Sequence, residues 1–261
     1  MSLPVPVLHR TGKGTPVLLL HPLGVDRSFW DGVVPALDGS EVLTYDLPGH
    51  GQTPAPEQLY TVEDLADQAR GLIADAGFAR IDVVGVSLGG LVALRLAADA
   101  PELVRRLVVV DAVAVYPQPM REMWRDRAAR APVEGVEPFL DPTLALWFTA
   151  GRLAEGGPAV EAARCAFLGG DARGYALACR ALEQADVTGV LDRITAPTLV
   201  VCGEDDAPPF TAAARDLGER LPDARVVWLS PARHAGVLEQ PDQFREALVD
   251  FIGEAPTEGL A

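Results

Sequence analysis

Short apolar runs separated by helical patterns extend over most of the chain. The runs are rich in β-branched residues and nearly continuous in apolarity, which is typical of parallel strands that are covered on both faces. We predict six strands, at residues 16–20, 41–45, 81–84, 106–110, 198–202 and 225–229. Between two of them, residues 61–78 have an N-cap threonine, Thr61, with Asp64 three residues later and a stop at Gly77. This alternation predicts a doubly wound, mostly parallel sheet with right-handed crossovers.

The alternation of strands and helices is interrupted between residues 112 and 195. Three pieces of this segment, at residues 120–130, 142–153 and 159–170, have helical patterns, and no run resembles a strand. We therefore predict an α/β core formed by residues 1–112 and 196–261, with a helical cap at residues 113–195 inserted into it.

Composition and charge narrow the class of protein. The chain has 261 residues, of which 49% are hydrophobic and 23% charged, as in ordinary globular proteins. A formal net charge of −15 argues against nucleic acid or an anionic membrane as partner. No apolar run approaches the roughly 20 residues that a membrane span needs, and no secretory signal is recognisable. Three cysteines without metal-binding spacing favour reduced thiols in the cytoplasm.

A glycine-rich turn encloses one serine where the strand at residues 81–84 passes into a helical pattern. Gly85-Val86-Ser87-Leu88-Gly89 fits the pattern G-x-S-x-G. In such an elbow the neighbouring positions must lack Cβ, the serine hydroxyl is lifted clear of the sheet, and the following N–H faces a developing oxyanion. The alternative is a glycine-rich connection that contains a serine without a catalytic role.

A serine needs a base to become a nucleophile at neutral pH, and the chain has four histidines. His9 lies in the first strand region and is expected at the surface or an edge. His21 and His50 lie in loops after strands, where they can satisfy backbone groups. His234 follows the last predicted strand, at the same edge of the sheet as Ser87, and is the favoured general base.

The base needs a carboxylate that fixes its tautomer and stabilises the imidazolium. Glu204, Asp205 and Asp206 follow the strand at residues 198–202, again at this edge, although three successive carboxylates can also form a solvated turn. A carboxylate here completes the chain order Ser, Asp, His of hydrolases. Asp111, which ends the strand at residues 106–110, is a second and less favoured position.

These segments together resemble an α/β-hydrolase from end to end. The resemblance rests on "HPLG" (21–24), "YDLPGHGQT" (45–53), "VGVSLGG" (84–90), "APTLVVCGEDD" (196–206) and "RHAGVLEQP" (233–241). Within that superfamily the chain is most similar to 3-oxoadipate enol-lactonases, because the "LWFT" and "GYALACRALEQADV" segments resemble the cap helices of that family. The resemblance implies an α/β-hydrolase fold with a helical cap.

The resemblance also assigns roles to individual positions. It implies that Ser87 is the nucleophile, His234 the base and Asp206, rather than Asp205, the acid. The oxyanion hole then consists of the backbone N–H groups of Leu23 and Leu88. No metal and no organic cofactor are implied, since backbone dipoles supply the charge stabilisation.

The cap is expected to shape the substrate pocket. Trp124 and Trp147 would line it, although both rings can equally belong to the core of the cap. Enol-lactonases commonly have a basic residue where this chain has Leu146, so the carboxylate of their substrate would lack that partner. Arg127 or Arg121 of the cap can compensate; otherwise the substrate is a less charged ester or lactone.

The resulting functional prediction is a serine hydrolase that cleaves a small carboxylic ester or lactone through an acyl-enzyme, with 3-oxoadipate enol-lactone as one candidate. Three alternatives use the same residues: a general carboxylesterase, a carbon–carbon bond hydrolase or perhydrolase, and a ligand receptor with slow turnover. We expect a small-molecule substrate, no nucleic-acid or membrane partner, and a monomer or homodimer.

Overall fold

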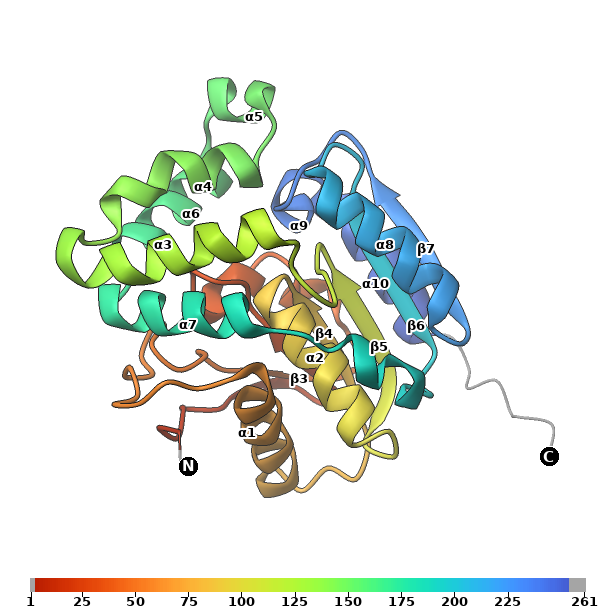
Figure 1. Cartoon of the computed structure of the whole chain (residues 1–261). Coiled ribbons are helices and arrows are strands. Elements are labelled where there is room, and N and C mark those ends of the chain that lie inside the picture. The colour runs from red at the N-terminus through yellow and green to blue at the C-terminus, as the bar shows by residue number, and fades with distance from the viewer. Residues whose placement is uncertain (1–2, 254–261) are drawn as a thin grey trace, which may run out of the picture.

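A twisted sheet forms the centre of the computed structural model, which describes residues 3–253 (Figure 1). Its strand order is β1-β3-β2-β4-β5-β6-β7, and every neighbouring pair is parallel except β1 and β3. The strands are β1 (His9–Gly12), β2 (Thr15–Leu20), β3 (Ser40–Thr44), β4 (Ile81–Val86), β5 (Val104–Val110), β6 (Thr198–Gly203) and β7 (Ala224–Leu229). The predicted doubly wound, mostly parallel sheet is therefore confirmed.

All six strands expected from the apolar runs are present, with ends that differ by at most a few residues. The interior strands β4 and β6 are buried along their whole length, as continuous apolar runs predict. Strand β1 begins at His9, in the region where the sequence places a strand at the surface or an edge, but it is not one of the six apolar runs. Its sequence, "HRTG", is polar and mostly exposed because it lies antiparallel to β3 at the edge of the sheet, where one face remains in water.

Helices cover both faces of the sheet. Helices α2 (Leu88–Asp99) and α8 (Pro208–Arg220) lie in front of it in Figure 1, with α1 (Val62–Asp75) against α2, and α10 (Pro241–Gly253) lies behind. The short helices η1 (Arg27–Trp30) and η2 (Val34–Ala36) follow β2, and Trp30 packs against Phe244 of α10. Within residues 3–253, no helix has the length and apolar character needed to cross a membrane.

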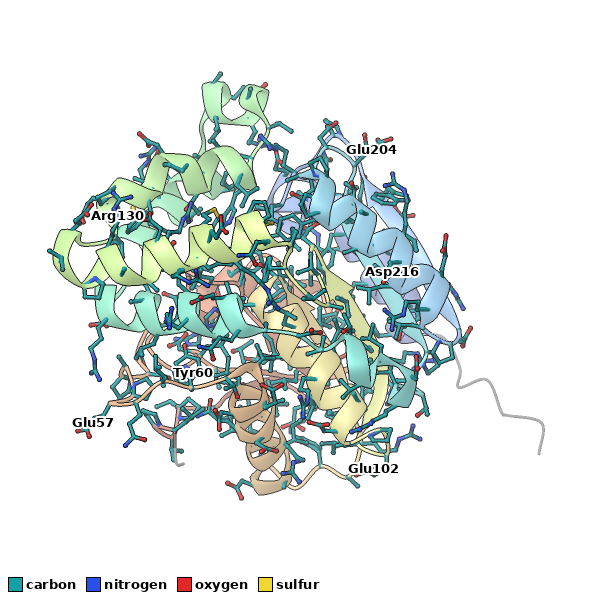
Figure 2. The ribbon with its side chains drawn as sticks, viewed as in Figure 1. Glu57, Tyr60, Glu102, Arg130, Glu204 and Asp216 are labelled. Atoms are coloured by element: carbon teal, nitrogen blue, oxygen red, sulfur yellow. The ribbon has the colours of Figure 1, made fainter. Side chains whose placement is uncertain are left out.

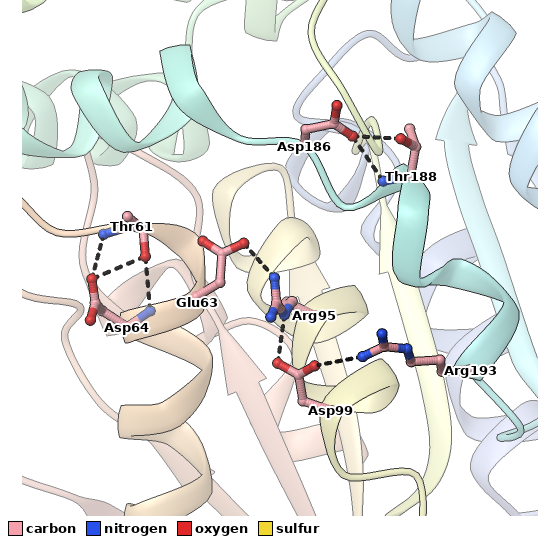
Figure 3. Close-up of polar contacts among 8 residues, drawn as sticks. All are labelled: Thr61, Glu63, Asp64, Arg95, Asp99, Asp186, Thr188 and Arg193. Atoms are coloured by element: carbon pink, nitrogen blue, oxygen red, sulfur yellow. Dashed lines mark hydrogen bonds and ion pairs between the residues drawn. The ribbon is translucent and has the colours of Figure 1, made fainter.

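Helix α1 begins with the capping box that the sequence predicts. The Thr61 hydroxyl accepts a hydrogen bond from the Asp64 N–H at 3.2 Å, and the Asp64 carboxylate accepts one from the Thr61 N–H at 2.8 Å (Figure 3). Gly77 follows the helix with a φ of 86°, in the left-handed region that favours glycine. Arg95 of α2 forms an ion pair with Glu63 of α1, which links the two helices on the face of the sheet.

The segment between β5 and β6 is helical. It consists of α3 (Gln118–Glu134), η3 (Glu137–Phe139), α4 (Leu140–Trp147), α5 (Ala150–Glu155), α6 (Pro158–Leu168), α7 (Ala172–Gln184) and η4 (Thr188–Arg193). Helices α3 and α7 pack along each other (Figure 1). The helical pattern at residues 142–153 divides into α4 and α5, because Phe148 is extended and the Thr149 hydroxyl caps a new helix.

The turn from β4 into α2 brings backbone atoms into close contact and positions Ser87. A Cβ atom at Gly89 would lie 2.2 Å from the carbonyl oxygen of Leu20, and one at Gly85 would lie 2.1 Å from the carbonyl oxygen of Gly89. Real Cβ atoms do not approach oxygen so closely. Both glycines are therefore required for α2 to begin directly over the end of β2.

We expect Gly89→Ala to destabilise the protein by at least about 2 kcal/mol, because the new methyl group meets backbone atoms that cannot rotate away. Gly71→Ala is the matched control. Gly71 is an exposed residue inside α1 with no atom within 4 Å of the added Cβ, so this change is expected to stabilise the protein by about 0.5–1 kcal/mol. Urea unfolding of the two variants measures both effects, and equal stabilities would contradict the packing argument.

Candidate active site

Ser87 occupies the turn between β4 and α2. Its φ of 53° and ψ of −110° place a non-glycine residue in a sparsely populated conformation, which the sheet maintains through a 2.9 Å hydrogen bond from the Ser87 N–H to the Val110 carbonyl. The side chain is buried beneath the cap. Backbone strain at a hydroxyl residue is the feature that the glycine-rich pattern predicts for an elbow.

His234 lies in the loop between β7 and α9 (Gly236–Glu239) and contacts two of the predicted site residues. Its Nε2 atom is 3.0 Å from the Ser87 Oγ, and its Nδ1 atom is 2.8 Å from the Asp206 Oδ2. Asp206 accepts from Nδ1–H, so Nε2 carries the lone pair and can accept the serine proton. The structure thus brings together three side chains that are up to 147 residues apart in the chain.

Asp206 is the buried member of the three successive carboxylates after β6. Glu204 and Asp205 are exposed, and Figure 2 shows Glu204 at the periphery of the molecule. Asp206 points inward, and its Oδ1 accepts a 2.6 Å hydrogen bond from the Ala207 N–H. Both of its oxygens therefore accept a hydrogen bond, one from His234 and one from the Ala207 N–H.

The environment of His234 makes it a stronger base than an ordinary imidazole. Burial alone would lower the pKa of His234, but the Asp206 carboxylate outweighs burial and raises it above 6.5. The ring of Phe210 covers the imidazole with ring centroids 4.1 Å apart, which excludes water from that side. A buried imidazole held between a carboxylate and a hydroxyl can accept and return a proton.

The predicted oxyanion donors lie in the segments expected for them. Leu88 is the first residue of α2, so its N–H has no acceptor within the helix. Leu23 lies in the loop after β2, and in residues 3–253 no hydrogen bond is found from its N–H. His21 holds this loop: its Nδ1 donates to the Pro22 carbonyl at 2.8 Å, and its Nε2 accepts from the Leu47 N–H at 2.9 Å. His21 thus satisfies backbone groups.

Arg127 is a buried cation in the cap, with only 7% of its surface exposed. Its Nη1 donates to the Thr143 hydroxyl and to the Tyr175 hydroxyl, both at 2.9 Å, and its guanidinium lies over the rings of Trp124 and Phe139. No carboxylate in the described part of the chain pairs with it. The positive charge of Arg127 is therefore desolvated without being neutralised, which is costly for a buried group.

Trp147 and Glu239 fasten the cap to the loop that carries His234. The Trp147 carbonyl accepts a 2.8 Å hydrogen bond from the Ala235 N–H. The buried Glu239 carboxylate accepts from the Thr149 N–H at 2.9 Å and hydroxyl at 2.7 Å, and from the Arg233 N–H at 2.7 Å. These bonds, which we call the cap clasp, hold the residues on both sides of His234. Sequence reasoning missed Glu239, which reads as an ordinary helical glutamate.

Tyr116 is a second residue that sequence reasoning missed. Its ring packs against Trp124 and Phe210 at centroid distances of 5.7 and 6.3 Å. Its hydroxyl is buried without a hydrogen-bond partner in the described structure, and it faces the hydroxyl of Ser87, which opposes the upward effect of burial on the pKa of Tyr116. Tyr116 therefore lies close to the hydroxyl of Ser87.

An apolar cavity of about 380 Å³ lies between η1, α6 and α9. It is lined in part by Val25 and Val237, from the two segments that carry Leu23 and His234. The three cap residues predicted to form a pocket (Trp124, Arg127 and Trp147) do not line this cavity and are instead buried in the cap.

One cluster in residues 3–253 has donor atoms close enough to hold a metal ion. One atom each from Asp111, Cys202 and Asp206 lie within 4.8 Å of one another. Both oxygens of Asp206 are already used by His234 and by the Ala207 N–H. Asp206 is therefore already committed to hydrogen bonds, and we assign no metal to this cluster.

Comparison with known proteins agrees with this geometry. Residues 17–247 match the family model described as the alpha/beta hydrolase family. The chain is 30% identical to 3-oxoadipate enol-lactonase 2 of Acinetobacter baylyi, covering 87% of this chain and 84% of that protein. It is also 30% identical to the pimeloyl-[acyl-carrier protein] methyl ester esterase of Nitrosomonas europaea, covering 91% and 95% of the two chains.

A solved structure is similar over nearly the same length. The crystal structure of the enol-lactonase from Burkholderia xenovorans LB400 has a TM-score of 0.90 to this structure and 33% sequence identity, and covers 97% of this chain and 98% of that one. The strand order, the strained Ser87 turn and the helical segment between β5 and β6 are consistent with these matches. The chain belongs to the α/β hydrolase family.

Proposed function

We propose that this protein is a serine hydrolase that cleaves a small carboxylic ester or lactone through an acyl-enzyme. The observation that supports the proposal is the continuous hydrogen-bonded series Ser87 Oγ, His234 and Asp206, with separations of 3.0 and 2.8 Å. Each member is buried, and each follows a different parallel strand. Nucleophile, base and acid within hydrogen-bond reach are the arrangement that acyl transfer requires.

In the proposed reaction His234 removes the Ser87 proton as the hydroxyl attacks the substrate carbonyl. The N–H groups of Leu23 and Leu88 stabilise the oxyanion, and each such donor contributes about 2.7–4 kcal/mol. His234 then gives its proton to the leaving oxygen, and it activates a water molecule that releases the acyl group. Asp206 keeps the imidazole oriented and stabilises its positive charge throughout.

The unpaired charge of Arg127 supports a substrate that carries a carboxylate. A carboxylate placed against this guanidinium would neutralise a charge that the cap leaves uncompensated. Arg121 is less suitable, because it already lies near a carboxylate. Hydrogen bonds from Thr188 lower the pKa of Asp186, and the charge of Arg121 adds a smaller effect in the same direction. An enol-lactone with a carboxylate side chain satisfies both Arg127 and the proposed chemistry, and two of the similar proteins are enol-lactonases.

The apolar cavity between η1, α6 and α9 supports a second candidate, a carboxylesterase for neutral acyl groups. It has room for a short aliphatic or aromatic moiety and is lined mainly by apolar side chains. The two candidates share the same nucleophile and base. They differ in whether a negative charge on the substrate helps or hinders turnover.

A hydrolysis panel tests the reaction class. It contains 3-oxoadipate enol-lactone, simple lactones, p-nitrophenyl esters of graded length and a vinylogous diketone. We expect turnover of the oxygen esters or lactones, and a loss of at least about 1,000-fold in kcat for Ser87→Ala and for His234→Ala with the fold intact by circular dichroism. Tight binding of these compounds with equal, negligible turnover in wild type and Ser87→Ala would instead indicate a receptor.

The identity of the acid is tested by two neighbouring isosteric changes. We expect Asp206→Asn to lower kcat/KM at pH 7 by at least about 100-fold, because His234 loses the carboxylate that is hydrogen-bonded to its Nδ1 and orients its ring. Asp205→Asn removes an exposed carboxylate and is expected to change it less than about threefold. A larger loss of kcat/KM in Asp205→Asn than in Asp206→Asn would show that Asp205 is the acid.

Substrate charge is tested at Arg127. We expect Arg127→Gln to reduce the ratio of kcat/KM for the enol-lactone to that for its neutral methyl ester by about 100-fold, since a buried charge pair is lost. Arg130→Gln is the matched control on the same helix, because Arg130 is exposed and paired with Glu134. An unchanged ratio in Arg127→Gln would favour the carboxylesterase for neutral substrates.

A further inference from the structure

Asp111 is a buried carboxyl group that the proposed reaction does not use. It follows β5 directly, is 1% exposed, and has a φ of 46°, which is unusual for a residue other than glycine. Its N–H donates to the Val201 carbonyl, and its Oδ1 accepts a 2.9 Å hydrogen bond from the Gly203 N–H. Its Oδ2 has no partner in the described residues. The fold thus maintains a strained, half-satisfied acid in its interior.

Asp111 lies directly beside the acid of the proposed site. An oxygen of Asp111 is within 4.8 Å of an oxygen of Asp206, and the Cys202 sulfur lies within the same limit of both. The titratable groups that influence Asp111 are Asp206, His234 and Cys202. Burial raises the pKa of the Cys202 thiol, so it stays neutral. Asp111 and Asp206 therefore form a pair of neighbouring carboxyl groups beside the imidazole of His234.

Two buried carboxyl groups at this separation do not both ionise, because the second negative charge is repelled by the first and is poorly solvated. Asp206 has two donors, the imidazole and the Ala207 N–H, whereas Asp111 has one backbone N–H. The negative charge therefore resides on Asp206 and the proton on Asp111. Burial raises the pKa of Asp111 to about 8, and the charge of Asp206 adds to this effect.

We propose that Asp111 and Asp206 form an acid pair behind His234 that carries a single negative charge at neutral pH, and that Asp111 is a positioning residue whose carboxylate can replace that of Asp206. This inference rests on the proposed serine hydrolase. In the wild type the proton stays on Asp111 while His234 exchanges its proton with Ser87 and the leaving group. When Asp206 is made neutral, Asp111 loses its repelling neighbour, releases its proton to solvent and stabilises the imidazolium.

The activities of four proteins test whether the Asp111 carboxylate can replace that of Asp206. The kcat/KM of wild type, Asp206→Asn, Asp111→Asn and the double variant is measured from pH 5.5 to 9.5 with p-nitrophenyl acetate, with Ser87→Ala as baseline. We expect Asp206→Asn to exceed the double variant by at least tenfold above neutral pH. The ratio of kcat/KM for Asp206→Asn to that for the double variant should rise with pH as Asp111 ionises, because the double variant lacks that carboxyl group. Equal activity of these two variants at every pH would overturn the proposal.

Thermal stability gives a readout that does not depend on turnover. The folded pKa of Asp111 lies above its unfolded value, so the native state holds a proton that the unfolded chain releases, and stability is lost as pH rises from about 4 to about 8. Asn tolerates the left-handed backbone, so Asp111→Asn should melt higher than wild type by a margin that grows across this window. A margin that is the same at every pH would overturn the acid pair.

The two measurements separate the acid pair from the proposed function. If the hydrolase proposal is wrong, wild type and all variants stay at the Ser87→Ala baseline, and the melting data alone then decide whether Asp111 holds a proton. Asp205→Asn serves as the control for melting. It removes an exposed carboxylate instead of a buried one, so its melting temperature should follow that of wild type at each pH.

Discussion

The contact between the start of α2 and the end of β2 is the constraint on which the rest of the site depends. Only a backbone without Cβ atoms at Gly85 and Gly89 lets the helix begin so close to the Leu20 carbonyl. That approach forces Ser87 into its strained conformation and leaves the N–H of Leu88 without an intrahelical partner. One steric requirement thus positions the proposed nucleophile and its proposed oxyanion donor together.

The parallel sheet brings the other side chains of the site together. Ser87, Asp111, Asp206 and His234 follow β4, β5, β6 and β7, which are successive neighbours in the sheet, so their side chains converge at one edge although the helical cap separates β5 from β6 in the chain. The same convergence crowds two carboxyl groups into one buried space. The strand order therefore has an electrostatic consequence. Because β5 and β6 are neighbours, Asp111 and Asp206 must share one buried environment of low dielectric constant.

Sequence reasoning was effective where a local pattern carries the information. Continuous apolar runs predicted the interior strands, and the glycines around Ser87 predicted the turn. The polar strand β1 escaped because its pairing with β3, rather than its own residues, makes it a strand. The choice of Asp206 over Asp205 needed the family resemblance. The hydrogen bonds from Arg127 to Thr143 and Tyr175, and from Thr149 to Glu239, could not be predicted, because they join residues 16 to 90 positions apart.

The cap clasp has a consequence for how the molecule can work. Glu239 and the Trp147 carbonyl bind the backbone on either side of His234 as well as the cap, so α4 and α5 cannot lift without pulling on the imidazole. The cap clasp couples the two parts: if α4 and α5 moved away from the core, His234 would lose its alignment with Ser87. In the proposed reaction, Ser87 can therefore be activated only while these hydrogen bonds keep His234 in place.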